Sequence, residues 1–403
     1  MGSPLRVLAI TRIFPNAVEP LAAAFNRQQF AALGQLCDLR VMATIPWFPA
    51  SGLVKSSKTS SLREVPARDV IAGLDVRHPR VVYVPGLAGL SGALEVASLL
   101  PSFMAEVKRG VDVVLGSWAY PEGAASIALA RLARVPAVVK AHGSDLNVQG
   151  DMLGPRTNLA FALPRAHRVV PVSKALGEQA VRLGARPESV EVVANGTDAK
   201  LFLLRDRDEV RRALTWPGGW PERLVLYVGR IERAKGVLDL LAAFATIADR
   251  DRGLSLALLG DGGAMAEARA AAAPLGDRVR FLGARPLAEV TQWMSASTLV
   301  TLPSHAEGSP NVVREALACG RPVVGTNVGG IPELVTPANG ALVPAKDPRA
   351  LGEALLAVAS RTFDPAEIRA SSGGSWEESA AALLRVLTSA VDEHRRAAAA
   401  NSR

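Results

Sequence analysis

The sequence contains very few cysteines. Cys37 and Cys319 are the only two among 403 residues. A single bridge would add little to a chain of this length, so both are expected to be free thiols in a reducing cytosol. The Cys and His residues also form no cluster with the spacing of zinc ligands. The sequence therefore gives no sign of a structural zinc site.

Long hydrophobic runs are also missing. No apolar run approaches the ~20 residues that a membrane-spanning helix needs. The chain enters a strand-like run, LRVLAIT (5–11), with no basic leader and no small-residue cleavage site before it. We therefore expect no signal peptide and a cytoplasmic location.

Aromatic residues make up only 5% of the chain, and they do not alternate with basic residues in a stacking strip. This argues against single-stranded nucleic acid as a partner. The net charge is nevertheless +8, with basic residues scattered among acids as in RDRDEVRR (205–212). Two interpretations of this charge stay open: an arginine-rich coding bias, or a patch that docks on an anionic membrane surface.

Familiar catalytic signatures are absent as well. The sequence has no G-x-S-x-G, P-loop or kinase motif. The glycine-rich LLGDGG (258–263) is not a G-x-G-x-x-G and has no acidic residue ~20 positions later to hold a ribose, so it is interpreted as a turn beside a cleft. The acidic pair in DRD (206–208) lies away from any strand end and is discounted as a metal site.

The sequence does contain a regular alternation of short apolar, β-branched runs with helical stretches rich in alanine and leucine. Such a pattern predicts parallel sheets covered by helices on both faces. The fold class is therefore predicted to be α/β, with two doubly wound, Rossmann-like domains. The runs lie at 5–11, 39–44, 111–117, 136–142, 167–173 and 190–195, and then at 223–229, 254–260, 279–283, 297–304, 322–327 and 340–344.

One segment interrupts this series. Residues 198–222 mix charge, proline and glycine, which is typical of a linker followed by a first helix. We place the boundary near 198–205, giving an N-terminal domain over 1–200 and a C-terminal domain over 201–374. Ligands of doubly wound sheets bind beyond the carboxyl ends of the strands, so two facing units would share one cleft.

The first candidate site is HAEGSPNVVREALACG (305–320), which follows a predicted strand. Ser309 is a good N-cap, Pro310 suits the first helical position, and Gly320 suits the helix end. A strand, a loop and a helix start form an anion site, because free N–H groups and the positive end of the helix point the same way. Glu307 would lie beside this anion site.

Glu315 would lie about one and a half turns into the same helix. Carboxylates accept paired hydroxyls well, so one acid could hold a sugar ring and the other a ribose. A partly exposed helix residue paired with a nearby arginine explains Glu315 equally well. The spacing alone leaves both interpretations open.

The second candidate is GRIERAKG (229–236), also at a predicted strand end. Arg230 offers a planar fork for phosphate and Lys235 a point charge. Together they could hold a diphosphate and stabilise it as a leaving group. A surface charge is the alternative for Lys235.

Two stretches of the N-terminal half also follow predicted strands. KAHGSDLN (140–147) places His142 and Asp145 at a strand end, where a functional role is favoured over a structural one for the histidine. NGTDAKLF (195–202) begins with a turn signal, and Phe202 is interpreted as an anchor for the linker.

Taken together, these segments resemble the family 4 retaining glycosyltransferases of the GT-B fold. The similarity covers nearly the whole chain and is strongest over 303–335, where Glu307 and Glu315 match the E-x₇-E pattern of that family. GRIERAKG, VRFLG (279–283), NGTDAKLF and SWEESAAALLRVL (375–387) support it. The AHGSD stretch is similar to members that build bacterial polysaccharides.

The resemblance implies a role for each matched residue. Arg230 and Lys235 would grip the diphosphate of a nucleotide-sugar donor, Glu315 would bind the ribose, and Glu307 the donor sugar. His142 would reach the donor sugar and steady developing charge. The remaining donor-binding residues would be Gly229, Gly308, Ser309, Pro310, Asn311 and Val312.

The resemblance also implies that no metal or other cofactor is needed and that a final helix, 375–395, packs back on the N-terminal domain. One departure concerns the acceptor: relatives carry a Gly-Gly turn after the first strand, whereas residues 11–29 of this chain contain no glycine. Candidate acceptor-side residues are Phe14, Asn26, Arg27 and Asp145.

The expected function is transfer of a sugar from a nucleotide-diphosphate donor to a glycan or lipid-linked acceptor, at the cytoplasmic face of a membrane. Two alternatives remain: another GT-B chemistry, such as a glycoside phosphorylase or a nucleotide-sugar epimerase, and an inactive scaffold subunit. The donor base, the sugar, the acceptor and the oligomeric state are not readable from the sequence.

Overall fold

The computed structural model describes residues 3–20, 22–47, 61–84 and 86–401. The stretch KSSKTSS (55–61), which its polar and non-periodic sequence predicts to be a loop, lies outside these residues except for Ser61. The chain divides into two compact units. Unit 1 comprises Met1–Asn195 and Trp376–Arg403, and unit 2 comprises Gly196–Ser375. The chain therefore first passes from unit 1 to unit 2 between Asn195 and Gly196.

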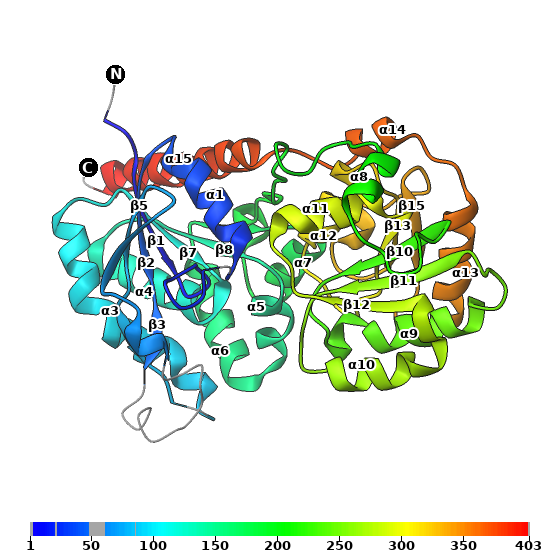
Figure 1. Ribbon diagram of the computed structural model, residues 1–403. Helices are drawn as coiled ribbons and strands as arrows, with labels where there is room; N and C mark the ends of the chain where they lie inside the picture. Colours follow the sequence, from blue (N-terminus) through cyan, green and yellow to red (C-terminus); the bar gives the residue numbers. More distant parts are fainter. Residues whose placement is uncertain (1–2, 21, 48–60, 85, 402–403) are drawn as a thin grey trace. The chain divides into compact units, whose positions relative to one another are not determined.

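Unit 1 is built on a seven-stranded sheet in the order β4-β5-β2-β1-β7-β8-β9 (Figure 1). All neighbours are parallel except β4 and β5. A separate parallel pair is formed by β3 and β6. The strands are β1 Arg6–Thr11, β2 Asp38–Ala43, β3 Ile45–Trp47, β4 Arg68–Ile71, β5 Leu74–Arg77, β6 Arg80–Val82, β7 Val113–Ser117, β8 Ala137–Ala141 and β9 Arg168–Pro171.

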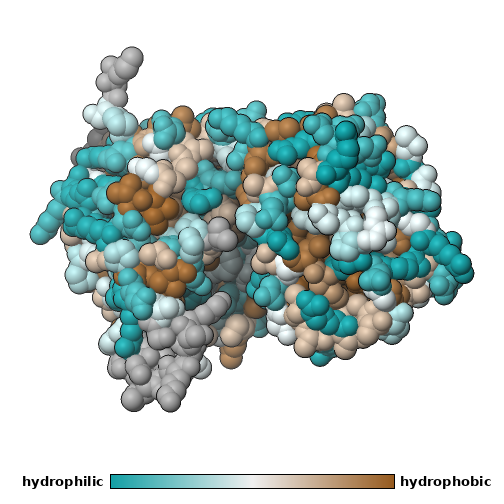
Figure 2. Space-filling model, in the orientation of Figure 1, coloured by the Kyte–Doolittle hydropathy of each residue, from teal (hydrophilic) through white to brown (hydrophobic). Residues whose placement is uncertain are grey.

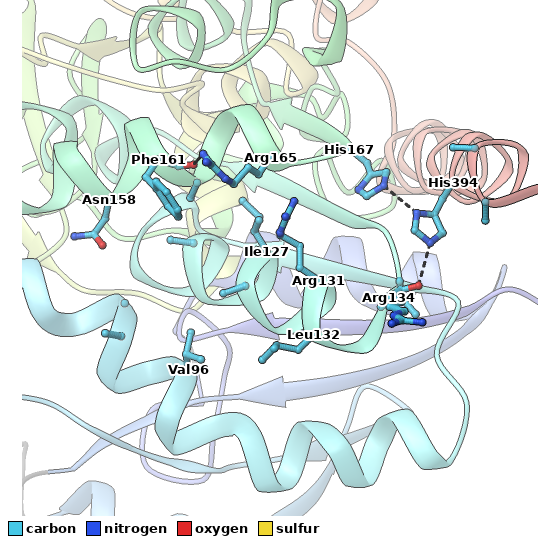
Figure 3. A pocket seen from close by; sticks show the side chains of 18 residues that line it. Val96, Ile127, Arg131, Leu132, Arg134, Asn158, Phe161, Arg165, His167 and His394 are labelled. Atoms are coloured by element: carbon cyan, nitrogen blue, oxygen red, sulfur yellow. Dashed lines mark hydrogen bonds between the residues drawn. The ribbon is translucent and has the colours of Figure 1, made fainter. Parts of the chain in front are cut away.

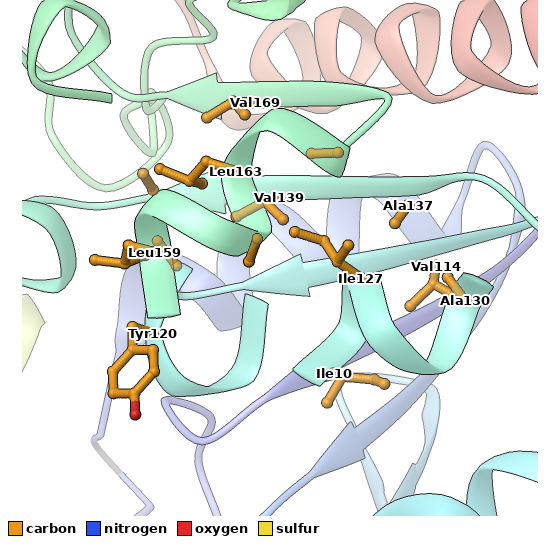
Figure 4. Close-up of a cluster of buried hydrophobic side chains, with 14 of the residues drawn as sticks. Ile10, Val114, Tyr120, Ile127, Ala130, Ala137, Val139, Leu159, Leu163 and Val169 are labelled. Carbon is orange, nitrogen blue, oxygen red and sulfur yellow. The ribbon is translucent and has the colours of Figure 1, made fainter. Parts of the chain in front are cut away.

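Helices cover both faces of this sheet, as the apolar strands require. They are α1 Ala24–Gly34, α3 Ser91–Lys108, α4 Ala124–Ala133, α5 Ser144–Asn147, α6 Leu153–Ala162, α7 Lys174–Arg182 and α15 Trp376–Asn401. Successive residues of β1 point to opposite faces, so Leu8 and Ile10 join one core while Val7 and Ala9 join the other. Figure 4 shows the first of these cores, where Ile10 lies with Ile127 and Val139.

The C-terminal helix α15 belongs to unit 1 and packs against α1 in the second core. A chain of buried hydrogen bonds also holds α15 in place. Lys140 of β8 donates to the side-chain carbonyl of Gln29, whose amide donates to Ser379 Oγ at 2.8 Å. Ser379 in turn donates to the carbonyl of Ala194 at 2.6 Å. Burial lowers the pKa of Lys140 to about 7, and the chain holds α1, α15 and the end of the first chain segment together.

Unit 2 is built on a six-stranded, wholly parallel sheet in the order β12-β11-β10-β13-β14-β15. Its strands are β10 Arg223–Val228, β11 Leu254–Leu259, β12 Val279–Gly283, β13 Leu299–Leu302, β14 Val323–Thr326 and β15 Gly340–Val343. Its helices are α8 Arg207–Ala213, α9 Val237–Ile247, α10 Met265–Ala272, α11 Leu287–Ala296, α12 Asn311–Ala318, α13 Pro348–Ser360 and α14 Pro365–Ala370. Two apolar cores again lie on the two faces. The predicted fold class is confirmed: each unit is a doubly wound α/β sheet.

The strand predicted at 190–195 was wrong. Only Val190 forms an isolated bridge, although Glu191 N–H bonds Val169 O and Val193 N–H bonds Pro171 O. To extend the parallel ladder, the N–H of residue 171 would have to donate a hydrogen bond back to this segment, and proline has no N–H. The ladder therefore cannot continue, and the segment runs beside the sheet edge without becoming a strand.

One helical stretch, Ala88–Lys108, is long and apolar enough to cross a membrane by length and composition, a property absent from the sequence-based expectation. Within unit 1 it packs one side onto the core, through the fully buried Leu99 and Phe103. Glu106 on the same side is buried in ion pairs with Arg40 and Arg77. These contacts indicate a covering helix of the α/β sheet, and length alone is weak grounds for a membrane span.

Candidate active site

The loop between β13 and α12 is held from several sides in unit 2. Thr326 Oγ1 donates to the carbonyl of Ser304 at 2.6 Å, and Gly330 N–H donates to the carbonyl of Gly308 at 2.8 Å. Gly329 has φ +53°, and a Cβ there would lie 2.0 Å from the carbonyl oxygen of Glu307. Only glycine allows this close approach. The backbone around Glu307 is therefore fixed before any ligand binds.

The helix after this loop starts one residue later than predicted. Pro310 is the N-cap and Asn311 the first helical residue, and the side chain of Ser309 makes no cap bond. Ser309 is largely buried, at 9% exposed. The predicted helix end is confirmed, because Gly320 follows the cap with φ +69°. The N–H groups of the first helical turn therefore belong to the residues from 311 onward.

Lys235 and Glu307 form an ion pair. Lys235 Nζ lies 2.7 Å from Glu307 Oε1, and Ser304 Oγ donates to the same oxygen at 2.7 Å. Their side chains are 24% and 11% exposed. A short 3₁₀ turn (Arg233–Lys235) ends at Gly236, where a Cβ would lie 1.9 Å from the carbonyl oxygen of Pro303. The two predicted segments are thus packed together within one unit.

Arg230 stands at the end of β10 with its side chain 70% exposed. Its guanidinium pairs with Glu232 Oε1 at 2.8 Å, and its carbonyl accepts a bond from Tyr227 OH at 2.6 Å. The backbone of Gly260 packs closely against that of the preceding residue, Gly229. A Cβ at Gly260 would lie 1.9 Å from the carbonyl oxygen of Gly229. The guanidinium is therefore reachable by a ligand, while its backbone is held.

Glu315 lies on α12, one turn beyond the helix start. Its side chain is partly exposed, and desolvation raises the pKa of the carboxyl to about 7. A solvated helix face would not do this. The proposed contact of Glu315 with a ribose stays a prediction.

His142 of unit 1 is at the end of a hydrogen-bond chain whose direction can be worked out. Asn26 Nδ2 donates to the carbonyl of Ile13 at 2.9 Å and to Thr11 Oγ1 at 3.3 Å, so its Oδ1 must be an acceptor. Ser117 Oγ donates to that Oδ1 at 3.1 Å. Ser117 Oγ therefore accepts from His142 Nε2–H, at 2.9 Å.

This chain fixes the tautomer of His142 and leaves Nδ1 as a bare acceptor. Nδ1 is buried and bonds to nothing in the described part of the chain. Burial, with a smaller effect of the charge on Lys140, lowers the pKa of His142 well below its usual value. The imidazole is thus neutral around pH 7. Phe25 and Trp118 flank it, with ring centroids 5.1 and 6.1 Å away.

The structure does not support three of the four acceptor-side residues as lining residues. Phe14 is 2% exposed and stacks on Phe30 in the core, and Asn26 is fully buried in the chain above. Asp145 is fully buried, and its carboxylate accepts the backbone N–H groups of 119, 142 and 143. It therefore holds the turn that carries His142. Arg27 is partly exposed and stays a prediction.

Two features of the site were not found from the sequence. Ser117 is the residue that orients His142, and it lies 25 positions away along the chain. His305, next to the E-x₇-E pattern, bonds Asp239 of α9 at 2.6 Å through Nε2. The ends of adjacent parallel strands, 113–117 and 137–141, were a signal that could have pointed to Ser117. The Asp239 contact has no such signal.

In the described residues, no group of three or more His, Cys, Asp and Glu side chains could hold a metal ion. What unit 2 does hold together is an arginine, a lysine, two glutamates and a helix start at the carboxyl ends of a doubly wound sheet. Cations with a helix start suit phosphates, and carboxylates suit hydroxyls. This fold and this set of groups define a class of α/β proteins with two doubly wound units, one of which carries groups suited to phosphates and hydroxyls.

Comparison with known proteins gives the family. Residues 25–196 match the family described as "Glycosyl transferase 4-like domain", and residues 222–361 match "Glycosyl transferases group 1". The chain is 30% identical over 358 residues to the teichuronic acid biosynthesis glycosyltransferase TuaC of Bacillus subtilis, covering 87% of this chain and 88% of the relative. The chain belongs to the family 4 glycosyltransferases of the GT-B fold.

Further relatives agree with this placement. D-inositol 3-phosphate glycosyltransferase 1 of Catenulispora acidiphila is 34% identical over 248 residues, covering 56% of this chain and 58% of the relative. Among solved structures, Anabaena HepE in complex with UDP has a TM-score of 0.68 at 22% identity, covering 99% of this chain and all of HepE. At 22% identity, the similarity to HepE shows the fold alone.

Proposed function

We propose that this glycosyltransferase moves a sugar, with retention of configuration, from a nucleotide-diphosphate sugar to a glycan or lipid-linked acceptor in cell-surface polysaccharide synthesis. The observation that carries the proposal is the arrangement of Lys235, Glu307, Arg230 and Glu315 in one unit. The similarity to TuaC supports the polysaccharide role. The UDP and UDP-glucose bound by HepE support the donor class.

The roles follow from the chemistry of each group. Lys235 and Arg230 would exchange their carboxylate partners for the diphosphate and stabilise it as it leaves. Glu307, released from Lys235, would accept hydroxyls of the donor sugar, and Glu315 those of the ribose. His142, being neutral, would accept a sugar hydroxyl at Nδ1. The acceptor hydroxyl would attack from the face that the diphosphate leaves.

A thermal-shift screen against UDP-, GDP- and ADP-sugars tests the donor class, because a bound donor raises the unfolding midpoint by mass action. Product analysis then tests the reaction. Transfer with retention supports the proposal. Phosphate-dependent release of sugar identifies a phosphorylase, and isomerised donor an epimerase. A chain that neither binds nor hydrolyses any donor is a scaffold.

Metal independence is part of the proposal, because Lys235 and Arg230 supply the positive charge that a divalent ion would otherwise bring to the diphosphate. Chelation by EDTA is expected to leave the transfer rate unchanged. A loss of activity that Mg²⁺ or Mn²⁺ restores would refute this.

We also propose that the enzyme works as a peripheral protein on an anionic membrane, with unit 1 as the docking face. A groove of about 1190 Å³ in unit 1 is mostly apolar and carries arginines (Figure 3). Phe161 and Leu132 line it, 65% and 63% exposed. The arginines are Arg131, Arg134 and Arg165.

Unit 1 carries nearly all of the exposed large apolar side chains. Among described residues they include Leu153, 85% exposed, whereas unit 2 contributes only Leu204 and Leu342, at 39% and 37%. Figure 2 shows such side chains grouped in patches between hydrophilic ones. Apolar groups beside arginines suit the boundary between acyl chains and anionic headgroups.

Flotation with vesicles containing or lacking phosphatidylglycerol tests this docking. The double variant Leu153→Ser with Phe161→Ser is expected to lose vesicle binding. Val70→Ser, which removes an equally exposed apolar side chain (74%) from the edge strand β4, is the matched control and is expected to keep it. Binding that neither anionic lipid nor the double variant changes would overturn the docking face.

A further inference from the structure

A second cavity in unit 1 is small and acidic. It measures about 190 Å³ and lies between the loops after β1 and β6, helix α3 and the turn Ala119–Gly123 that follows β7. At ~30 Å³ per water molecule it has room for about six waters, which suits one sugar-sized ring. Its charged and aromatic lining residues are Arg12, Tyr83, Glu95, Tyr120 and Glu122.

Three carboxyl oxygens of this cavity are buried without a hydrogen bond among the described residues. Glu95 is 2% exposed and Glu122 is fully buried. Glu95 Oε1 and both carboxyl oxygens of Glu122 receive no hydrogen bond from any residue in the described ranges. The nearest cation is Arg12, with Nε 3.5 Å from Glu122 Oε1 and a side chain 41% exposed. Buried polar atoms are rarely left unpaired, because each costs ~1–3 kcal/mol.

The neighbouring tyrosine cannot satisfy these carboxyl groups. Tyr120 OH donates to the carbonyl of Ala88 at 2.6 Å and lies 3.4 Å from the N–H of Gly92. Burial raises the pKa of Glu95 well above its usual range, with the charge of Glu122 adding to the shift. Burial also raises the pKa of Glu122 to about 7, although Arg12 acts in the opposite direction. The two acids and one arginine therefore hold little net charge near pH 7 and offer both a donor and acceptors.

The cavity is joined to the loop that carries His142. Asp145 Oδ2 accepts the N–H of Ala119, the first residue of the turn that bears Glu122, and Asp145 also binds the N–H of His142. The orphaned carboxyls and the imidazole are thus fixed to one another inside unit 1. A ligand in the cavity would be held close to the residue proposed to contact the reacting sugar.

We propose that this cavity binds a neutral, hydroxyl-bearing ring, a sugar or cyclitol unit of the acceptor, whose hydroxyls satisfy Glu95 and Glu122. The inference rests on the proposed transfer to a glycan or lipid-linked acceptor. A carboxylated or phosphorylated ring would bring an unpaired charge into this buried site of little net charge, and the loss of its hydration would oppose binding. A neutral ring donates hydrogen bonds to the carboxylate oxygens and accepts one from the protonated partner.

Ligand-observed NMR with the protein in its full-length form tests the site. The probes are methyl glucoside, methyl galactoside, methyl mannoside, methyl N-acetylglucosaminide and myo-inositol, with glucuronate and glucosamine as charged counterparts. At least one neutral probe is expected to bind, at least 10-fold more tightly than glucuronate and more tightly than glucosamine. Glu122→Gln with Glu95→Gln should weaken that probe at least 10-fold.

Matched controls separate folding and donor binding from this site. Glu178→Gln changes a glutamate whose side chain is 74% exposed on α7 and should leave probe binding unchanged. The nucleotide-induced thermal shift reports on unit 2, so its loss with intact probe binding would overturn the proposed donor and leave the cavity standing. Binding of no neutral probe, stronger glucuronate or glucosamine binding, or a folded Gln variant that binds normally would each overturn the cavity proposal.

Discussion

The pair of Lys235 and Glu307 allows a sharp test of the donor site. Lys235→Ala removes a cation that lies 2.7 Å from a carboxylate in a half-buried place. Breaking a buried pair costs ~3–5 kcal/mol and a surface pair ~0–1, so ~1–3 kcal/mol is expected here, the more so because Ser304 still donates to Glu307. For a unit of this size, ~2 kcal/mol corresponds to a fall of about 4–8 °C in Tm.

The loss of turnover should be far larger than the loss of folded protein. Removing one preorganised group that stabilises developing charge lowers kcat by ~10²–10³-fold. A protein with ~5–15 kcal/mol of stability stays folded after losing ~2 kcal/mol. Lys200→Ala, which removes an exposed lysine of unit 2, is the matched control and should change neither Tm nor kcat appreciably.

A double-mutant cycle with Glu307→Ala then shows whether the lysine changes partner. Without nucleotide, the coupling free energy between the two residues should be about 1–2 kcal/mol. With saturating UDP or the true nucleotide, Lys235 would engage phosphate and the coupling should fall toward zero. Turnover of Lys235→Ala within about threefold of the parent, or a coupling that nucleotide leaves unchanged, would refute the reasoning.

Three other substitutions probe the remaining groups. Glu315 has a folded pKa of about 7, above the usual 4.5, so its charge destabilises the fold above pH 7 and not below pH 4.5. Glu315→Gln should raise the free energy of unfolding at pH 8 by at most ~3 kcal/mol, with no gain at pH 4.5, and should weaken nucleotide binding ~10-fold or more in calorimetry. Gly329→Ala would place a Cβ 2.0 Å from the carbonyl of Glu307 and should lower donor affinity, whereas Gly263→Ala, with nothing within 4 Å, should not. Ser117→Ala should lower kcat ~5–50-fold at constant nucleotide affinity, because the imidazole loses the hydroxyl that fixes its tautomer; burial, which keeps the imidazole neutral, is unchanged, so no new pH step is expected.

The sequence was sufficient for the fold class because apolar strands and helices alternate over most of the chain. It failed in 45–82, where four strands were not predicted. Those strands have three or four residues each, and two of them, RDVI and LDVR, carry two charged residues each. The Ala72-Gly73 pair, with φ +53° and +79°, was the hairpin signal that could have revealed β4 and β5.

For the candidate site, position along a strand was predictable but pairing was not. Placing Lys235 and Glu307 each after a predicted strand was enough to bring them near one sheet edge. The ion pair itself joins residues 72 positions apart, and no local pattern encodes it. Phe14 and Asn26 were misjudged for a related reason. A segment after a strand suggests exposure, whereas the loop with Phe14 turns into the core and Asn26 lies on the buried side of α1.

The two units leave their polar groups in different states, and this bears on specificity. In unit 2, Lys235, Arg230 and His305 all have carboxylate partners, so a donor exchanges one set of ionic bonds for another and gains little discrimination from it. In unit 1, Glu95 and Glu122 retain orphaned oxygens. A site whose buried polar groups need a partner rejects a ligand that lacks the matching hydroxyl by ~10⁴-fold or more, whereas an already satisfied site does not. We therefore expect the acceptor to be selected more strictly than the donor, so that removing one acceptor hydroxyl lowers kcat/KM far more than changing the nucleotide base. A comparison of deoxy acceptors with UDP-, GDP- and ADP-sugars would show the reverse order if the orphaned carboxyls have no ligand.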